Sequence, residues 1–293
     1  MELEALLVGL VFSLVTILGF LGNSLIIALL SVCAFQEMKL APAERILLML
    51  AMANLLFVLT LGLPLTTSAF KYRYLLTDKA CRADLFLARV SRAMTICLTS
   101  LLTCYQGITL ASASWKWRYV KSHIQTHLNP LVFLLLLVSL TSSINAALFP
   151  IAGKNFTDLY HTFNLGYCLA VYPDQLSFQL VGFITFFRDL VFVILMAFAS
   201  AYILWLLNRH EKQVKDLKKS TNMESQAAKT VLTLTVVYVM IIGIDNIMWF
   251  YQITMSKQVA LISDTRHFLS TCYPAVFPMV VLVFNRKLRQ KLS

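Results

Sequence analysis

Seven long apolar stretches follow one another along this chain of 293 residues. A helix needs roughly 20 apolar residues to cross the ~30 Å hydrocarbon core of a bilayer, because it rises ~1.5 Å per residue. Each stretch exceeds that length. They are Ala5–Ala34, Ile46–Phe70, Leu85–Ala111, Leu128–Ala152, Leu176–Leu207, Ala227–Thr254 and Val259–Phe284. The sequence therefore predicts an all-α integral membrane protein, a seven-transmembrane helix bundle that forms a single domain over residues 1–293.

Composition and charge exclude several classes of protein. The chain is 59% hydrophobic and 13% charged, whereas soluble domains are about 45–50% apolar and about 25% charged. Its net charge is +11, but the basic residues lie between apolar stretches, so nucleic acid is not an expected partner. His123 and His127 are four residues apart and lack a third metal ligand. We expect no enzyme activity, no cofactor and no metal.

The distribution of Lys and Arg predicts an extracellular N-terminus. With this orientation the inner segments hold 14 basic residues: Lys39, Arg45, Lys116, Arg118, Lys121, Arg209, Lys212, Lys215, Lys218, Lys219, Arg286, Lys287, Arg289 and Lys291. The outer segments hold 7: Lys71, Arg73, Lys79, Arg82, Lys154, Lys257 and Arg266. Cytoplasmic loops of membrane proteins carry the excess of Lys and Arg, which favours this topology.

Two features of the predicted outer segments agree with this orientation. Asn155-Phe156-Thr157 is a glycosylation sequon, and such sequons are used on surface loops of secretory proteins. Of the six cysteines, only Cys81 and Cys168 fall in outer segments, where oxidation is possible. We expect the other four to fill space within the helices as small hydrophobic side chains.

Charged residues inside the predicted spans mark a candidate ligand site, because charge is costly in the bilayer and is kept for pairing or function. We expect five residues to gather in the outer half of the bundle: Arg89, Arg92, Arg188, Asp245 and Trp249. An arginine guanidinium makes a two-pronged bond to a carboxylate or sulfate. Three arginines against the two acids Asp189 and Asp245 favour an anionic ligand.

The alternative interpretation is an internal ion-pair network, because buried charges need partners in either case. Arg92 would then pair with Asp245, and Arg188 with Asp84 or Asp189. Since Arg188 and Asp189 are adjacent, we expect their side chains to point to different neighbours.

The inner segments provide a candidate surface for a cytoplasmic partner. Its residues are Gln106, Lys116, Arg118, Lys121, Lys215, Lys218 and Lys219. The basic segment of residues 209–229 also fits contact with membrane lipid, and the two uses do not exclude each other. A ligand that binds the active bundle better would shift the population toward it and open the inner ends.

These features resemble the rhodopsin-like receptors, but several landmarks of that class are replaced. Gly22-Asn23 matches the first-span pattern, whereas Asn54 stands in place of the second-span acid. The acid-Arg-Tyr triplet becomes Tyr105-Gln106-Gly107, and Phe277-Pro278 replaces Asn-Pro.

Together, these replacements and several local motifs resemble the vomeronasal type-1 receptors, including their fish branch. The motifs are Arg89-Val90-Ser91-Arg92, Leu98-Thr99-Ser100, Gln106-Gly107-Ile108-Thr109, Phe187-Arg188-Asp189-Leu190-Val191-Phe192, Asn208-Arg209-His210-Glu211-Lys212-Gln213-Val214 and Tyr273-Pro274. Ala111-Ser112 departs from the usual Ser-Pro of the family. The resemblance implies a pheromone or odorant receptor in the plasma membrane of sensory neurons, coupled to a heterotrimeric G protein of the inhibitory class. It also implies a Cys81–Cys168 disulfide and a glycan on Asn155.

Two other functions share some of these features. A bitter-taste receptor is a similar bundle, but as a rule it lacks the outer pair of cysteines and fits Arg188-Asp189 poorly. A secondary transporter of organic anions could also use intramembrane Arg and Asp, yet transporters tend to contain repeats and broken helices. No repeat is present here, and a non-signalling scaffold would not need a polar cluster at this depth.

Overall fold

The computed structural model describes residues 3–37, 40–70, 76–111, 115–152, 162–165, 167–214, 222–255 and 260–284. Within the helices, no side chain is described for residues 3–5, 37, 210–214, 222–230, 260, 261 and 284. The predicted glycosylation site Asn155 and the predicted partner-facing residues Lys215, Lys218 and Lys219 lie outside the described residues.

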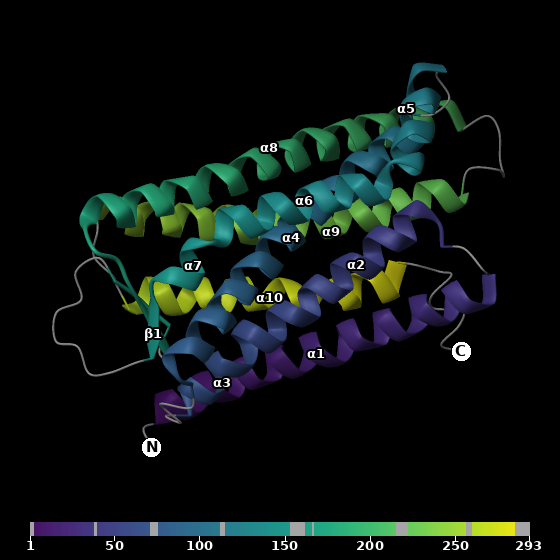
Figure 1. The fold of residues 1–293 in the computed structure, drawn as a ribbon. Coiled ribbons are helices and arrows are strands. Elements are labelled where there is room, and N and C mark those ends of the chain that lie inside the picture. The colour runs from purple at the N-terminus through teal and green to yellow at the C-terminus, as the bar shows by residue number, and fades with distance from the viewer. Residues whose placement is uncertain are drawn as a thin grey trace.

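The fold is a bundle of long helices (Figure 1). Six are each long and apolar enough to cross a membrane, and the bent pair Trp115–Thr126 and Leu128–Ser143 brings the number to seven when it is counted as one span. Five spans are single helices, namely α1 (Leu3–Glu37), α4 (Asp78–Leu110), α8 (Gln175–Val214), α9 (Asn222–Met255) and α10 (Ala260–Phe284). The second span consists of α2 (Pro42–Phe57), η1 (Val58–Gly62) and α3 (Leu63–Ala69), and α6 (Leu128–Ser143) belongs to the fourth. Large apolar side chains such as Phe198 and Ile247 are 72% and 71% exposed, which suits contact with lipid.

The fourth span differs from its predicted limits. The prediction placed it at Leu128–Ala152, but α6 ends at Ser143, the short α7 covers Asn145–Leu148, and residues 150–152 form a strand. At its other end α6 meets α5 (Trp115–Thr126) at a bend of 70°.

The second span contains a π-helical turn, and a proline explains it. Pro64 has no N–H, so the carbonyl of Thr60 four residues earlier loses its helical partner. Tyr167 donates a hydrogen bond of 3.4 Å to that carbonyl. A freed backbone group inside a membrane must find such a partner, because no water is available in the hydrocarbon core.

The same physical principle joins α1 to α10. Pro278 cannot donate to the carbonyl of Pro274, and Asn23 of α1 supplies the missing hydrogen bond at 2.7 Å. Gly22 permits this approach, because a Cβ at that position would lie 2.4 Å from a side-chain carbon of Pro278. The Gly22-Asn23 pair therefore packs against the part of α10 where Pro278 interrupts the backbone hydrogen bonds.

A small antiparallel sheet covers the end of the bundle opposite α5 (Figure 1). Its strands are β1 (Pro150–Ala152), β2 (Thr162–Asn164) and β3 (Cys168–Val171), in the order β1-β3-β2. Cys168 forms a disulfide with Cys81, which confirms this pairing and ties β3 to the first turns of α4. The sheet brings the side chains of Phe163 and Leu165 onto the cavity described next.

Candidate functional site

A cavity lies within the bundle, between the helices and the sheet. The space that no atom fills in it, counted together with the open solvent at its mouth, is about 710 Å³. Its lining combines apolar and aromatic walls with a group of charged and polar side chains. These are Phe57, Leu61, Leu85, Ala88, Phe163, Leu165 and Trp249 for the walls, and Arg89, Arg92, Thr185, Arg188, Asp189, Arg266, His267 and Ser270 for the polar group. Ligand sites commonly have this composition.

The five predicted site residues come together here. Four of them line the cavity: Arg89, Arg92, Arg188 and Trp249. The fifth, Asp245, is fully buried and forms an ion pair with Arg92. The pairs expected under the alternative interpretation are also present, since Arg92 meets Asp245 and Arg188 meets Asp189. The site is therefore both a cavity and an ion-pair network.

Arg92 is the centre of that network. Its guanidinium forms an ion pair with Asp245 of α9 and lies 3.6 Å from a carboxylate oxygen of Asp189 on α8. It also donates a hydrogen bond of 3.1 Å to Ser270 on α10. One side chain of α4 thus contacts three other spans.

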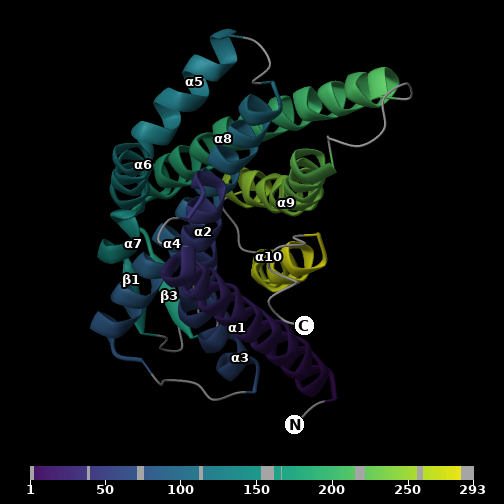
Figure 2. The same cartoon turned by 90° about the vertical axis from the view of Figure 1, so that its right-hand side faces the viewer.

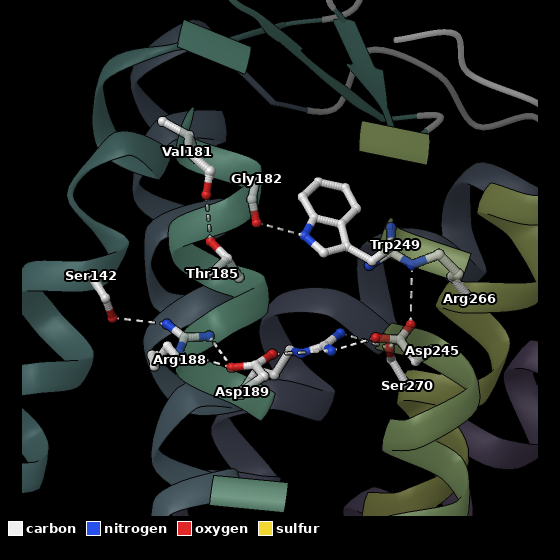
Figure 3. A network of polar contacts seen from close by, with 11 residues as sticks. Ser142, Val181, Gly182, Thr185, Arg188, Asp189, Asp245, Trp249, Arg266 and Ser270 are labelled. Atoms are coloured by element: carbon white, nitrogen blue, oxygen red, sulfur yellow. Dashed lines mark hydrogen bonds and ion pairs between the residues drawn. The ribbon is translucent and has the colours of Figure 1, made fainter. Parts of the chain in front are cut away.

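Arg188 does not behave as its place in the sequence led us to expect. The prediction that Arg188 and Asp189 point to different neighbours is wrong, because both Nε and Nη2 of Arg188 bond to Oδ1 of Asp189, at 2.8 and 2.6 Å. The long arginine side chain folds back along α8 to reach its neighbour. Its Nη1 donates to Ser142 of α6 at 2.8 Å (Figure 3). Asp84 is therefore not the partner of Arg188.

Arg266 is the main residue of the site that the sequence prediction missed. It was counted among the bases of the outer segments, but it lies in α10 and is only 7% exposed. Its Nε lies 3.2 Å from Oδ1 of Asp245, and Nη1 donates to Gln252 at 2.9 Å. Its position inside the seventh apolar stretch could have identified it. Removing Arg266 from the outer count leaves the excess of basic residues on the inner side.

Trp249 forms part of the wall and supports Arg266. The guanidinium carbon of Arg266 lies 4.4 Å from the centre of the Trp249 ring, a favourable cation–π distance. The indole N–H donates to the carbonyl of Gly182 on α8 at 3.2 Å (Figure 3). Gly182 permits this approach of α8 to α9, because a Cβ there would lie 2.6 Å from the side chain of Ile253.

The charges of the cavity do not cancel. Four arginines line it, and the two carboxylates of Asp189 and Asp245 pair with three of them. Within the described part of the chain, Arg89 has no ion-pair partner, and its Nη1 is buried without a hydrogen bond. Arg89 is therefore the arginine whose charge is unpaired in this site.

A row of hydroxyl groups runs along α4 from the cavity toward its other end. Ser91, Thr95, Thr99 and Thr103 recur every four residues, and each bonds to a carbonyl of the preceding turn. Three of these hydroxyls also reach other spans. Thr95 lies 3.1 Å from Asn54, Thr99 lies 3.2 Å from the hydroxyl of Tyr273, and Thr103 lies 2.7 Å from Thr235.

The inner-end residues predicted to face a partner differ in exposure. Gln106 is only 8% exposed within α4, whereas Lys116 and Arg118 are exposed on α5 and Lys121 is half-buried. Next to Gln106, the hydroxyl of Tyr105 accepts a hydrogen bond of 2.9 Å from Gln125 of α5. The position of the acid-Arg-Tyr triplet is occupied here by Tyr105-Gln106-Gly107. Two contacts lie at or just before it, namely Tyr105–Gln125 and Thr103–Thr235.

A seven-helix bundle with a cavity beside a disulfide-tethered sheet is consistent with the seven-transmembrane receptors, and the comparisons with known proteins identify the chemosensory family. The model of the vomeronasal organ pheromone receptor family matches residues 7–293. The chain is 35% identical to olfactory receptor class A-like protein 1 of Danio rerio over 295 residues, which covers 100% of this chain and 93% of that receptor. It is 26% identical to the vomeronasal type-1 receptor 4 of Homo sapiens, covering 94% of this chain and 93% of the relative.

The chain therefore belongs to the vomeronasal organ pheromone receptor family. This confirms the resemblance that its local motifs indicated. It is a multi-pass protein of the plasma membrane of sensory neurons and acts as a receptor, not as an enzyme.

Proposed function

We propose that this receptor recognises a small organic anion in the cavity, with Arg89 as the residue that binds its carboxylate or sulfate. The observation that carries the proposal is the unpaired guanidinium of Arg89 beside three paired arginines. Arg89 is half-buried, and within the described residues its buried Nη1 has no partner, so an anionic ligand gains by supplying the missing charge.

The walls of the cavity define the rest of the ligand. Phe57, Leu61 and Leu85 offer apolar surface, and Phe163 meets Trp249 edge to face at 5.5 Å. An aromatic or alicyclic body with one acidic group suits this lining. An amine would need a free carboxylate, but Asp245 is fully buried and already bonded to two arginines and Ser270.

We also propose that the end with the disulfide faces the outside of the cell. Disulfides form in oxidising compartments, and Cys81–Cys168 lies at the end where α4 begins. This orientation places the N-terminus outside and Asn155 in the extracellular loop between β1 and β2, where it would carry a glycan. An N-glycosidase tests this orientation. It should shift the electrophoretic mobility of the expressed receptor but not that of an Asn155→Gln variant.

Signalling would follow from a shift between two packings of the bundle. Arg92, one turn along α4 from Arg89, contacts α8, α9 and α10. The row of hydroxyl groups on α4 extends from this region to Thr103, one turn before Gln106. A ligand anion that binds one arrangement of these charges better favours that packing. A heterotrimeric G protein would bind the opened inner end near Lys116, Arg118 and Lys121. Its inhibitory class is an expectation from the family, which pertussis toxin tests.

The experiment that tests this function is a G-protein activation assay in cells that express the receptor. Each aromatic or alicyclic acid is compared with its matched amine and its neutral amide. We expect responses to acids alone. Responses to amines alone, at normal surface expression, would contradict the anion site.

A further inference from the structure

Helix α5 precedes α6 in the chain but turns sharply away from the direction of that apolar helix. It covers Trp115–Thr126, contains no buried residue and meets α6 at 70°. Figure 2 shows it at the rim of the bundle, running away from the end of α6 beside α8. A helix placed across the end of a span lies at the level of the lipid headgroups.

One face of α5 attaches it to the bundle. Trp117 lies 6.0 Å from the ring of Tyr202 on α8, and Ile124 packs against the buried core. Gln125 donates to Tyr105 of α4. These contacts fix which side of α5 remains uncovered.

The uncovered side is a row of aromatic rings. Trp115, Tyr119, His123 and His127 recur every four residues, and the first two are 77% and 67% exposed. Tyr119 stacks with His123 at 6.3 Å, and His123 lies 4.3 Å from His127. Side chains four residues apart share a helix face. Trp and Tyr are concentrated where membrane proteins meet the headgroup layer, since their rings have both apolar and polar parts.

Positive charges flank this row without any negative charge nearby in the sequence. Lys116 and Arg118 are exposed on α5, whereas the half-buried Lys121 lies on the attached face with Trp117 and Gln125. No acidic residue occurs between Asp84 and Asp158. On the adjacent α8, the guanidinium of Arg209 lies 5.6 Å from the ring centre of Trp205. Basic residues at the membrane surface attract acidic lipids.

We propose that α5 is an interfacial helix that binds the headgroups of acidic phospholipids, with Trp115 and Tyr119 inserted among the lipids and Lys116 and Arg118 on their phosphate and carboxylate groups. The assignment to the inner leaflet rests on the orientation proposed above; the preference for acidic lipid does not. The surface is a convex row of rings with cations on its flanks, which fits a layer of headgroups.

The test uses the purified full-length receptor in nanodiscs. Energy transfer from its tryptophans is measured to dansyl-phosphatidylserine and to dansyl-phosphatidylcholine, each at the same low fraction of the lipid. Three of the four tryptophans, namely Trp115, Trp117 and Trp205, lie on α5 and the adjacent part of α8. We expect transfer to the serine lipid to exceed transfer to the choline lipid by about twofold or more at low salt, and the excess to shrink at high salt.

Matched variants decide whether α5 is responsible. The double variant Lys116→Gln/Arg118→Gln should bring the ratio close to one, whereas Lys79→Gln, an exposed base at the opposite end of the bundle, should leave it unchanged. A Trp115→Ala/Tyr119→Ala variant should lower transfer to both lipids. A ratio near one in the unaltered receptor would overturn the proposal. A double variant that keeps the lipid preference of the unaltered receptor would also overturn it. The energy transfer is measured without any ligand, so failure of the anion site would not affect the result.

Discussion

Arg89 and Arg92 lie one helical turn apart on α4, but in the described part of the chain only Arg92 is ion-paired. Arg92 meets carboxylates of α8 and α9, whereas Nη1 of Arg89 is buried without a partner. We therefore propose different roles for the two arginines. Arg92 would hold spans together, and Arg89 would bind the ligand.

The Asp245 carboxylate should be essential for stability. Asp245→Asn leaves Arg92 and Arg266 without their shared partner, and breaking a buried pair costs about 3–5 kcal/mol. We expect a marked loss of thermal stability in detergent and reduced surface expression. Asp264→Asn, at an exposed position of α10, is the matched control and should have little effect. Equal stability of the two variants would show that the network contributes nothing.

The Asn23 amide should matter because Pro278 cannot donate a backbone hydrogen bond. Asn23→Ala leaves the carbonyl of Pro274 without its partner, and we expect a loss of about 1–3 kcal/mol. In a Pro278→Ala background the alanine N–H can bond to that carbonyl, so the same substitution should cost less. A double-mutant cycle on thermal stability measures the difference. Full additivity would argue against this role of Asn23.

The Thr103–Thr235 contact should restrain the inactive bundle. It joins α4 to α9 one turn before Gln106, at 2.7 Å. Thr103→Val or Thr235→Val keeps the size of the side chain and removes the hydrogen bond, which is typically worth about 1 kcal/mol. Losing this bond from the inactive bundle would raise the ratio of active to inactive receptor about fivefold. We expect basal G-protein activation to rise accordingly. The double variant should add nothing further. Thr126→Val on α5 is the control, and a similar rise there would make the effect non-specific.

The fold could be predicted from sequence because the bilayer requires long apolar helices. All seven spans lie where apolar stretches occur, and most of their ends differ by a few residues. The three-stranded sheet and the π turn at Val58–Gly62 could not be predicted. They depend on contacts between distant segments, such as Tyr167 with the carbonyl of Thr60 and Cys168 with Cys81.

The site could be predicted only in part. Intramembrane charge identified Arg89, Arg92, Arg188 and Asp245, because each is costly in lipid unless paired or used. Arg266 was missed because it lies near the end of a span, where a basic residue is easily assigned to the adjoining loop. Only its contact with Asp245 shows that it belongs to the site. Adjacency suggested that Arg188 and Asp189 diverge, but a side chain as long as arginine can reach its own neighbour. Which arginine stays unpaired depends on three-dimensional contacts alone.

The most direct test of the anion site is the potency of the best acidic agonist on Arg89→Gln, Arg89→Lys and Lys79→Gln receptors, compared at equal surface expression. Arg89→Gln removes the charge, and charge-assisted hydrogen bonds are worth about 1.5–3 kcal/mol, so we predict a loss of potency of about 10- to 150-fold. Arg89→Lys should recover part of it, because lysine keeps the charge but not the two-pronged geometry. Lys79→Gln should respond as the unaltered receptor does. Unchanged potency in Arg89→Gln, at normal surface expression, would contradict the role of Arg89 as the ligand's partner.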